Sequence, residues 1–454
     1  MSALKLALLR SRRALADGWP VLARARRATD ERLAAWSTRL PFRAAIALAC
    51  LAVQLIVATH SGDRFGVRAF NAAPGRPPTF RNPATDFAPT NWDRLVVARW
   101  DSGNYIDLGL RGYQYCPPRG PTLPVRVPSC NLAFYPTYGL LGRYLGRLTG
   151  MPIDFAMLAI SLVSSFVFIF LWTGKELTER LGRLETYVAL LCLNAFTTGY
   201  CLVTVQTEPL TLALAMGAFV AFARRRRLLG ALLAGAASGM RVTGIAVGLG
   251  YAAGLLIELL HDRPRAVWPW VRALGLGLLC AWGQLALMAY HAYRFGDPLT
   301  YFHAHALLFH HQPHLGALFP PDPTWINLSF EFPLHEGLWL AAALLWFGIG
   351  HREALRRFPL GERAFWYVMF WATVGIATVG MLPISLSGMS RYVLLALPMF
   401  FAMGAVMRSR PLLLALWITM SAWHYWNVDI CTYTGFMGDR TLKICHDEHW
   451  MKHH

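Results

Sequence analysis

Charged side chains are scarce in this chain of 454 residues. Asp, Glu, Lys and Arg together make up 15% of it, whereas hydrophobic residues make up 55%. A soluble protein carries about a quarter charged residues, and the mean hydropathy of this chain is +0.37. The composition therefore excludes an ordinary soluble domain and predicts an all-α integral membrane protein.

Acidic residues are the scarcer of the two charged kinds. The chain has 25 Asp and Glu against 43 Lys and Arg, a formal net charge of +18. In a soluble domain this excess would indicate a nucleic-acid partner, but here the basic residues stand between apolar segments. That placement fits anionic headgroups, so membrane lipids are the expected partners and nucleic acid is not.

Nucleotide-binding motifs are also missing from the sequence. It has no Walker loop, no GxGxxG after a strand and no nucleophile elbow. These absences argue against ATP or a nucleotide sugar as the donor of any transfer reaction.

The N-terminal region lacks the uninterrupted apolar core of a cleavable signal peptide. Leu4, Leu8 and Leu15 recur near helical spacing beside basic residues, which predicts a basic cytoplasmic segment over residues 1–42 that rests on the membrane. An organellar transit peptide is the alternative, because such peptides are also rich in Arg and poor in acidic residues.

Apolar runs separated by basic connectors dominate the region 43–427. With a cytoplasmic N-terminus, about eleven transmembrane helices would place every connector on the inner side, as the positive-inside bias requires. The connectors centre on Lys175, Arg224, Arg263, Arg352 and Arg408. The apolar runs fall at 43–59, 155–173, 186–205, 208–223, 228–240, 243–260, 273–293, 336–350, 364–382, 391–407 and 411–427.

This topology sends most of the conspicuous polar residues to the outer face. A large first outer loop, 60–152, contains the proline-rich stretch 74–90 and the aromatic stretch 131–148, which we expect at the outer interface. The joins near 206 and 241, the loops 294–335 and 383–390, and the tail 428–454 lie on the same side.

The cysteines divide along the predicted topology. Four fall in apolar runs and are expected to be small buried residues: Cys50, Cys192, Cys201 and Cys280. Four others fall on the outer side, where an oxidising compartment would permit two local disulfides, Cys116–Cys130 and Cys431–Cys445.

Asp101 heads the stretch around which the functional hypothesis is built. It is followed by apolar residues at Tyr105, Ile106 and Leu108, a spacing that predicts a short helix on the bilayer surface with its polar face toward a cavity. The alternative is a solvated Asp that caps a surface helix.

Three further charged residues lie at predicted outer ends of apolar runs. Glu208 begins one run, Arg241 interrupts another within Ser238–Gly244, and Arg391 with Tyr392 opens a third. An acidic residue at that depth is costly unless it faces a cavity or a partner, and Arg suits a phosphate. The alternatives are a capping Glu beside a turn-forming Pro, a snorkelling Arg and an interfacial anchor.

Histidines gather after Asp297. His303 and His305 are followed by His310, His311 and His314, but the spacing matches no closed zinc pattern and no Cys accompanies it. We therefore predict no metal site here and expect Asp297, His303 and His305 to line a substrate groove.

In their order, these motifs resemble the PIG-V type mannosyltransferases of the GT-C superfamily. The resemblance covers about residues 95–405. Gln206 and Pro209 depart from it, since an aromatic and a small polar residue are usual there. The motifs that carry it are Arg99-Trp100-Asp101 with Tyr105, Gly112-Tyr113, Ala133-Phe134-Tyr135-Pro136, Thr207-Glu208, Arg241 with Thr243-Gly244, Gly296-Asp297-Pro298 and Arg391-Tyr392.

The resemblance implies a GT-C-like fold and a sugar donor carried on a polyprenyl phosphate, with mannose as the expected sugar. It implies inversion at the anomeric carbon, with Asp101 as general base or orienting carboxylate. Arg241, Arg391 and Tyr392 would bind the donor phosphate. Contacts to sugar or acceptor would come from Trp100, Tyr105, Glu208, Asp297, His303 and His305.

The expected enzyme is thus a membrane glycosyltransferase of a bacterial inner membrane, with its active site on the periplasmic face. Its acceptor could be a lipid, a glycan or a protein, and participation of a divalent metal stays open. A transporter or flippase of lipid-linked sugars is the alternative, although few ionisable residues fall in the middle of the apolar runs. A structural membrane protein would leave the outer-face charges unexplained.

The predicted topology can be tested through the four outer cysteines. If all four lie in an oxidising compartment, mass spectrometry of the unreduced protein will find two peptide pairs, Cys116 with Cys130 and Cys431 with Cys445. Four free thiols at these positions would contradict the topology.

Overall fold

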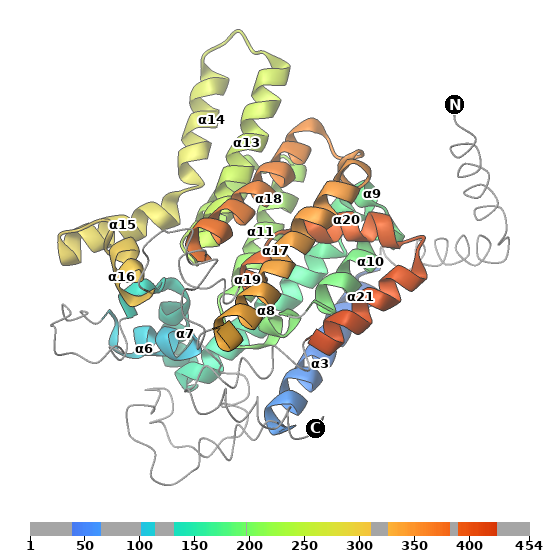
Figure 1. Ribbon diagram of the computed structural model, residues 1–454. Coiled ribbons are helices and arrows are strands. Elements are labelled where there is room, and N and C mark those ends of the chain that lie inside the picture. The colour runs from blue at the N-terminus through green and yellow to red at the C-terminus, as the bar shows by residue number, and fades with distance from the viewer. Residues whose placement is uncertain are drawn as a thin grey trace, which may run out of the picture.

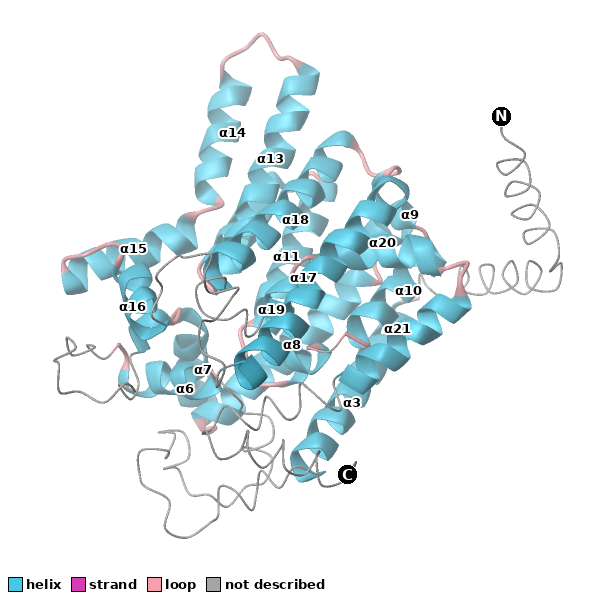
Figure 2. Ribbon diagram, viewed as in Figure 1, coloured by secondary structure: helices cyan, strands magenta, loops and turns pink. Residues whose placement is uncertain are grey.

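The computed structural model describes residues 39–64, 101–113, 131–196, 198–309, 326–381 and 389–424. Within these ranges every regular element is a helix and there is no strand (Figure 2), which confirms the all-helical prediction for this part of the chain. The predictions for Trp100, the stretch 74–90, the four outer cysteines and the tail 428–454 lie outside the described residues. The same holds for nearly all of the predicted segment 1–42 and for the side chain of His305.

The longer helices form a bundle (Figure 1). Its largest apolar core packs Trp366 against Phe219, with ring centroids 4.7 Å apart, and against Phe401 at 4.9 Å. The helices that contribute buried residues to this core are α3 (Leu40–Arg64), α8 (Ile153–Trp172), α9 (Lys175–Leu181), α10 (Arg183–Asn194), α11 (Glu208–Ala223), α12 (Arg227–Ser238), α13 (Ile245–Asp262), α17 (Ile326–Leu355), α18 (Leu360–Met381), α19 (Met389–Val393), α20 (Leu397–Met407) and α21 (Pro411–His424). Helix α14 (Trp268–Leu279) lies beside α13, and α15 (Trp282–Phe295) packs on α12 outside this core.

Three helical segments in the described residues are long and apolar enough to cross a membrane: Leu40–Thr59, Ile153–Trp172 and Val242–Asp262. Helices α14 and α15 meet at an angle of 57°, and together they would make a fourth span if the bent pair is treated as a single membrane-crossing segment. Helices α11, α12, α20 and α21 are apolar but shorter. The structure thus supports a membrane protein, while this count does not confirm eleven spans.

Three predicted apolar runs are broken in the structure. The run 186–205 ends as a helix at Asn194 and continues in the 3₁₀ helix η3 (Gly199–Val203). The run 391–407 is divided between α19 and α20, because Pro398 in the first turn of α20 lacks the N–H that a continuous helix needs. The predictions of single continuous helices at these places were wrong.

The third break separates α14 from α15. The Trp282 ring fills the space beside Gly235, and its Nε1 donates to the Leu232 carbonyl at 2.9 Å. Gly283 and Gly239 also approach backbone to backbone. Packing on α12 therefore turns α15 away from the axis of α14, which the apolar run 273–293 did not indicate.

Basic connectors meet at one end of the bundle. Arg224 pairs with Glu176 at 2.7 Å, Arg408 pairs with Glu353 at 2.6 Å, and Arg180 pairs with Glu362. These ion pairs join connectors that are far apart in the sequence. Figure 1 shows α9 and the turn between α13 and α14 at the end of the bundle away from α6 and α7.

The opposite end carries α6 (Ser102–Arg111), the 3₁₀ helix η2 (Asn131–Ala133) and α7 (Thr137–Thr149), while α16 (Thr300–Phe309) lies beside them (Figure 1). Helix α6 buries Tyr105, Ile106 and Leu108, as the spacing predicts, and ends at Gly112, whose φ of +78° favours glycine. Tyr105 meets the Phe134 ring edge to face at 5.6 Å. The described parts of the predicted loop 60–152 thus contain short helices, and their position at the outer interface stays a prediction.

A close approach of glycines holds α6 against α7. A Cβ added at Gly139 would collide with the Tyr105 carbonyl oxygen and would lie 3.0 Å from the Gly109 nitrogen. Leucine at this position would push apart the two helices that position Asp101.

We expect Gly139→Leu to destabilise the protein by about 1–3 kcal/mol because overpacking forces backbone shifts. Thermal unfolding in detergent measures the effect. Gly275→Leu is the matched control, since a Cβ there has no atom within 4 Å. Equal melting temperatures for the two variants would contradict the proposed close packing.

Candidate functional site

Asp101 stands immediately before α6, in the position of its N-cap. Its side chain makes no capping hydrogen bond, and Oδ2 instead accepts from Arg391 Nη1 at 2.9 Å. The side chain is 31% exposed. The simple capping hypothesis is therefore wrong, because the carboxylate is directed to a guanidinium on a distant segment.

Glu208 begins α11, where Pro209 in the first turn favours a helix start. Its side chain is 2% exposed. Oε1 accepts from Arg391 Nε at 2.8 Å and pairs with Arg241 Nη1 at 2.7 Å. Oε2 is buried and accepts no hydrogen bond from another described residue. Such an oxygen remains available to a donor such as a ligand hydroxyl group.

Arg241 lies in extended backbone between α12 and the 3₁₀ helix η4 (Val242–Gly244). The predicted helix break is confirmed, and the tight approach of Gly244 to the Ala237 carbonyl allows it. The Arg241 guanidinium stacks over the Tyr392 ring at 4.9 Å and pairs with Glu208. It is buried, so it does not snorkel to the surface.

Arg391 lies in α19 and is the centre of the arrangement. Nε donates to Glu208 Oε1 at 2.8 Å, Nη1 donates to Asp101 Oδ2 at 2.9 Å, and Nη2 donates to Gln206 Oε1 at 2.8 Å. The residue is 5% exposed. It is therefore more than an interfacial anchor, since its planar fork joins three segments of the chain.

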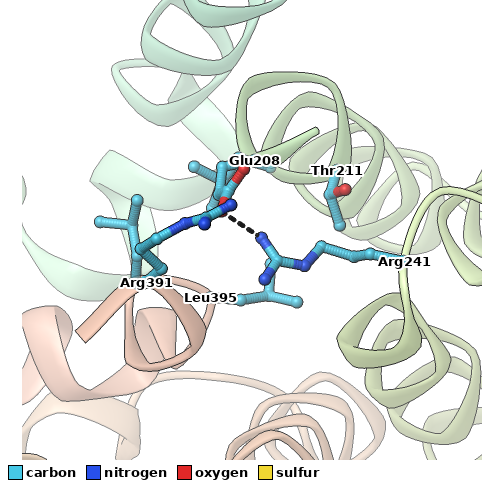
Figure 3. A pocket seen from close by; sticks show the side chains of 7 residues that line it. Glu208, Thr211, Arg241, Arg391 and Leu395 are labelled. Carbon is cyan, nitrogen blue, oxygen red and sulfur yellow. Dashed lines mark hydrogen bonds and ion pairs between the residues drawn. The ribbon is translucent and has the colours of Figure 1, made fainter. Parts of the chain in front are cut away.

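We call Asp101, Gln206, Glu208, Arg241 and Arg391 the Arg391 cluster. Its two guanidinium groups match its two carboxylates, so the cluster is electrically balanced as it stands. Figure 3 shows Arg391 and Arg241 reaching toward Glu208 from opposite sides. Burial makes each of these ion pairs depend strongly on its partner.

The side chains around this cluster leave no space for even a water molecule. A sugar phosphate would therefore require the cluster to open. The surrounding residues are Glu208, Thr211, Leu212, Arg241, Arg391, Leu394 and Leu395.

Sequence reasoning missed Gln206 and Ser102 as members of the site. Gln206 accepts from Arg391, and its Nε2 donates to Ser102 Oγ at 3.4 Å. Ser102 in turn donates to the Val205 carbonyl at 2.7 Å. Their positions beside Glu208 and Asp101 in the sequence are the signal that could have found them.

The aromatic site residues lie around the cluster in different ways. Tyr392 supports Arg241 through its ring. Tyr105 is buried between Phe134 and Tyr138, so in this structure it acts as packing for α6. Its predicted contact with sugar or acceptor stays a prediction.

Asp297 and His303 form a separate exposed pair, with 2.7 Å between Asp297 Oδ2 and His303 Nδ1. Hydrogen bonds from the Leu299 backbone N–H and then from His303 lower the pKa of Asp297. Neither residue has a hydrogen bond or ion pair to the Arg391 cluster in the described part of the chain. The structure does not bring them to the site, and their role stays a prediction.

Among the residues with described side chains, no group of three or more His, Cys, Asp and Glu is arranged to hold a metal ion. Among the described cysteines, Cys192, Cys201 and Cys280 are buried and Cys50 is half-buried. This agrees with their predicted role as small apolar residues.

The central position of Arg391 can be tested by conservative substitution. We expect Arg391→Lys to lower the free energy of unfolding by about 2–4 kcal/mol, because an ammonium group cannot reproduce three hydrogen bonds from a planar fork. Arg241→Lys should cost about half as much, since it loses fewer contacts. Thermal unfolding in detergent compares the two, and a larger loss for Arg241→Lys would contradict this ranking.

Comparison of the chain with family models, with curated proteins and with solved structures finds no match in any of the three. A functional conclusion therefore depends on the geometry of the Arg391 cluster.

Proposed function

We propose that this protein is a membrane glycosyltransferase that moves a hexose from a polyprenyl-phosphate donor to an acceptor at the extracytoplasmic face. The observation that carries the proposal is the contact of Asp101 with Arg391, within a cluster that also holds Glu208 and Arg241. A partly exposed carboxylate, a buried carboxylate and two guanidinium groups thus lie together, and these are the groups that such a transfer needs.

The donor phosphate would bind to Arg241 and Arg391. Departure of the sugar leaves negative charge on the phosphate oxygen, and fixed guanidinium groups in a buried site stabilise that charge most effectively. Both arginines are buried. The Arg241 guanidinium stacks on the Tyr392 ring, and Arg391 donates a hydrogen bond to Gln206. They are therefore in place before the charge develops.

Glu208 would orient the sugar. Its Oε1 is occupied by both arginines, whereas Oε2 accepts no hydrogen bond from another described residue. A sugar hydroxyl bound to the same phosphate would supply the missing donor.

Asp101 would serve as general base. The acceptor hydroxyl oxygen forms a bond to the anomeric carbon while its proton passes to the Asp101 carboxylate. The bond from the anomeric carbon to the phosphate oxygen breaks, and its electron pair stays on the phosphate. One such displacement inverts the anomeric centre, and proton transfer to a positioned base contributes about 10²–10⁴-fold to such a rate.

The membrane topology of the proposal has about eleven spans with the basic connectors inside. Its support is that ion pairs join connectors at one end of the bundle, while the Arg391 cluster lies at the other end with α6. By the positive-inside bias, the cluster then faces the periplasm of a bacterial inner membrane. Mannose as the sugar belongs to this proposal through the family resemblance.

A transporter of lipid-linked sugars is the second candidate, and the bent pair α14 and α15 is the feature that favours it. The pair contributes no residue to the Arg391 cluster, however, which comes from the start of α6, the start of α11, the turn before η4 and α19. The transferase remains the better explanation of the charges.

The transferase proposal predicts that Asp101→Asn lowers the rate of transfer from polyprenyl-phosphate-mannose by about 10²-fold or more. The amide keeps the size of the side chain but cannot accept the proton. Product formation is measured by mass spectrometry, and melting in detergent establishes that the variant is folded. Asp154→Asn, which removes a half-buried carboxylate from the first turn of α8, is the control that should retain activity. Full activity of folded Asp101→Asn would remove Asp101 from the mechanism.

A further inference from the structure

Charge balance in the Arg391 cluster bears on how a phosphate could bind there. The two arginines are matched by Asp101 and Glu208, and the side chains around them leave no space for even a water molecule. A phosphate added to this balanced and closed cluster would bring uncompensated negative charge into a buried site, which is strongly unfavourable. One carboxylate must therefore give up its arginine when the phosphate arrives.

Glu208 is poorly placed to leave. It is 2% exposed, its Oε1 lies 2.7 Å from nitrogens of both Arg241 and Arg391, and it is fixed in the first turn of α11. Removing it would leave two like charges close together without a partner.

Asp101 is well placed to leave. It is the most exposed of the four charged side chains, it receives one hydrogen bond from Arg391, and its side chain makes no capping bond to α6. It belongs to the outer-loop helix, and the other members of the cluster are held among α11, η4 and α19. Rotation of one side chain would open Arg391 Nη1 toward solvent.

We infer that the donor phosphate binds to Arg391 in exchange for Asp101, so that donor binding itself releases the catalytic base. This inference rests on the proposed function and adds an order of events to it. Before the donor binds, Asp101 Oδ2 accepts a hydrogen bond from Arg391 Nη1 at 2.9 Å, so this oxygen faces the guanidinium and not an acceptor hydroxyl. Afterwards Arg391 holds the phosphate and the free carboxylate faces the acceptor hydroxyl.

The exchange also fits the charge of the donor. With Asp101 released, Arg241, Arg391 and Glu208 together carry one net positive charge, which matches the single negative charge of a phosphodiester. The acceptor consequently binds after the donor. Without a bound donor, Asp101 stays paired with Arg391.

The test measures affinity for farnesyl phosphate, a short isoprenoid phosphate, by titration of the purified full-length protein in detergent at about pH 5, where this monoester carries mostly a single negative charge, like the donor. Asp101→Asn removes the internal competitor, so its dissociation constant should be about fivefold lower than that of the wild type. Asp154→Asn removes a carboxylate outside the cluster and should bind like the wild type. Binding to Asp101→Asn that is equal to or weaker than wild-type binding overturns the exchange.

A second measurement uses the wild-type protein and needs no substitution. Carbodiimide labelling read out by mass spectrometry should modify Asp101 faster when farnesyl phosphate is present, whereas the labelling of Asp154 stays unchanged. Labelling of Asp101 that is unchanged or slower overturns the exchange while leaving phosphate binding intact. If neither the wild type nor Asp101→Asn binds farnesyl phosphate, the proposed function fails and the exchange fails with it.

Discussion

Burial of the Arg391 guanidinium is the constraint on which the end of the bundle beside α6 depends. A buried charge is tolerated when it is paired and hydrogen-bonded, and breaking a buried pair costs about 3–5 kcal/mol. Arg391 meets that requirement with Asp101, Gln206 and Glu208. These three residues lie 183 to 290 positions from it in the sequence. Its three hydrogen bonds thereby hold the start of α6, the start of α11 and α19 in one place. The same interaction that stabilises the fold assembles the groups that the proposed chemistry needs.

The two ends of the bundle use charge in different ways. At the connector end, the Arg224 side chain is 50% exposed and pairs with buried Glu176, whereas the Arg408 side chain is 20% exposed and pairs with exposed Glu353. A pair close to the surface, such as Arg408 with Glu353, contributes about 0–1 kcal/mol. At the other end, both arginines and Glu208 are buried and Asp101 is partly exposed, so a ligand of matching charge would replace Asp101 at a lower cost than Glu208. This difference is the physical basis for proposing that the chemistry takes place at the end of the bundle that carries α6.

Sequence patterns predicted those parts of the fold that depend on local chemistry. The spacing of Tyr105, Ile106 and Leu108 indicated the buried face of α6, and the small residues around Arg241 indicated the break before η4. The bend between α14 and α15 was missed because its cause is tertiary, the packing of Trp282 beside Gly235. For the site, the charged residues were found individually, but no local pattern could show that Gln206 lies opposite Arg391. Conversely, Asp297 and His303 were grouped with the site on sequence grounds, and the structure holds them apart as an exposed pair.

The central claim is that the Arg391 cluster supports group transfer from a lipid phosphate. Its most direct test is mass spectrometry of the products formed when the purified protein is incubated with polyprenyl-phosphate-mannose and a membrane extract that contains acceptors. The account predicts an acceptor heavier by one hexose and an equal amount of free polyprenyl phosphate. If the donor lipid stays intact while the protein is folded, or crosses a membrane without forming any glycosidic product, the account is contradicted.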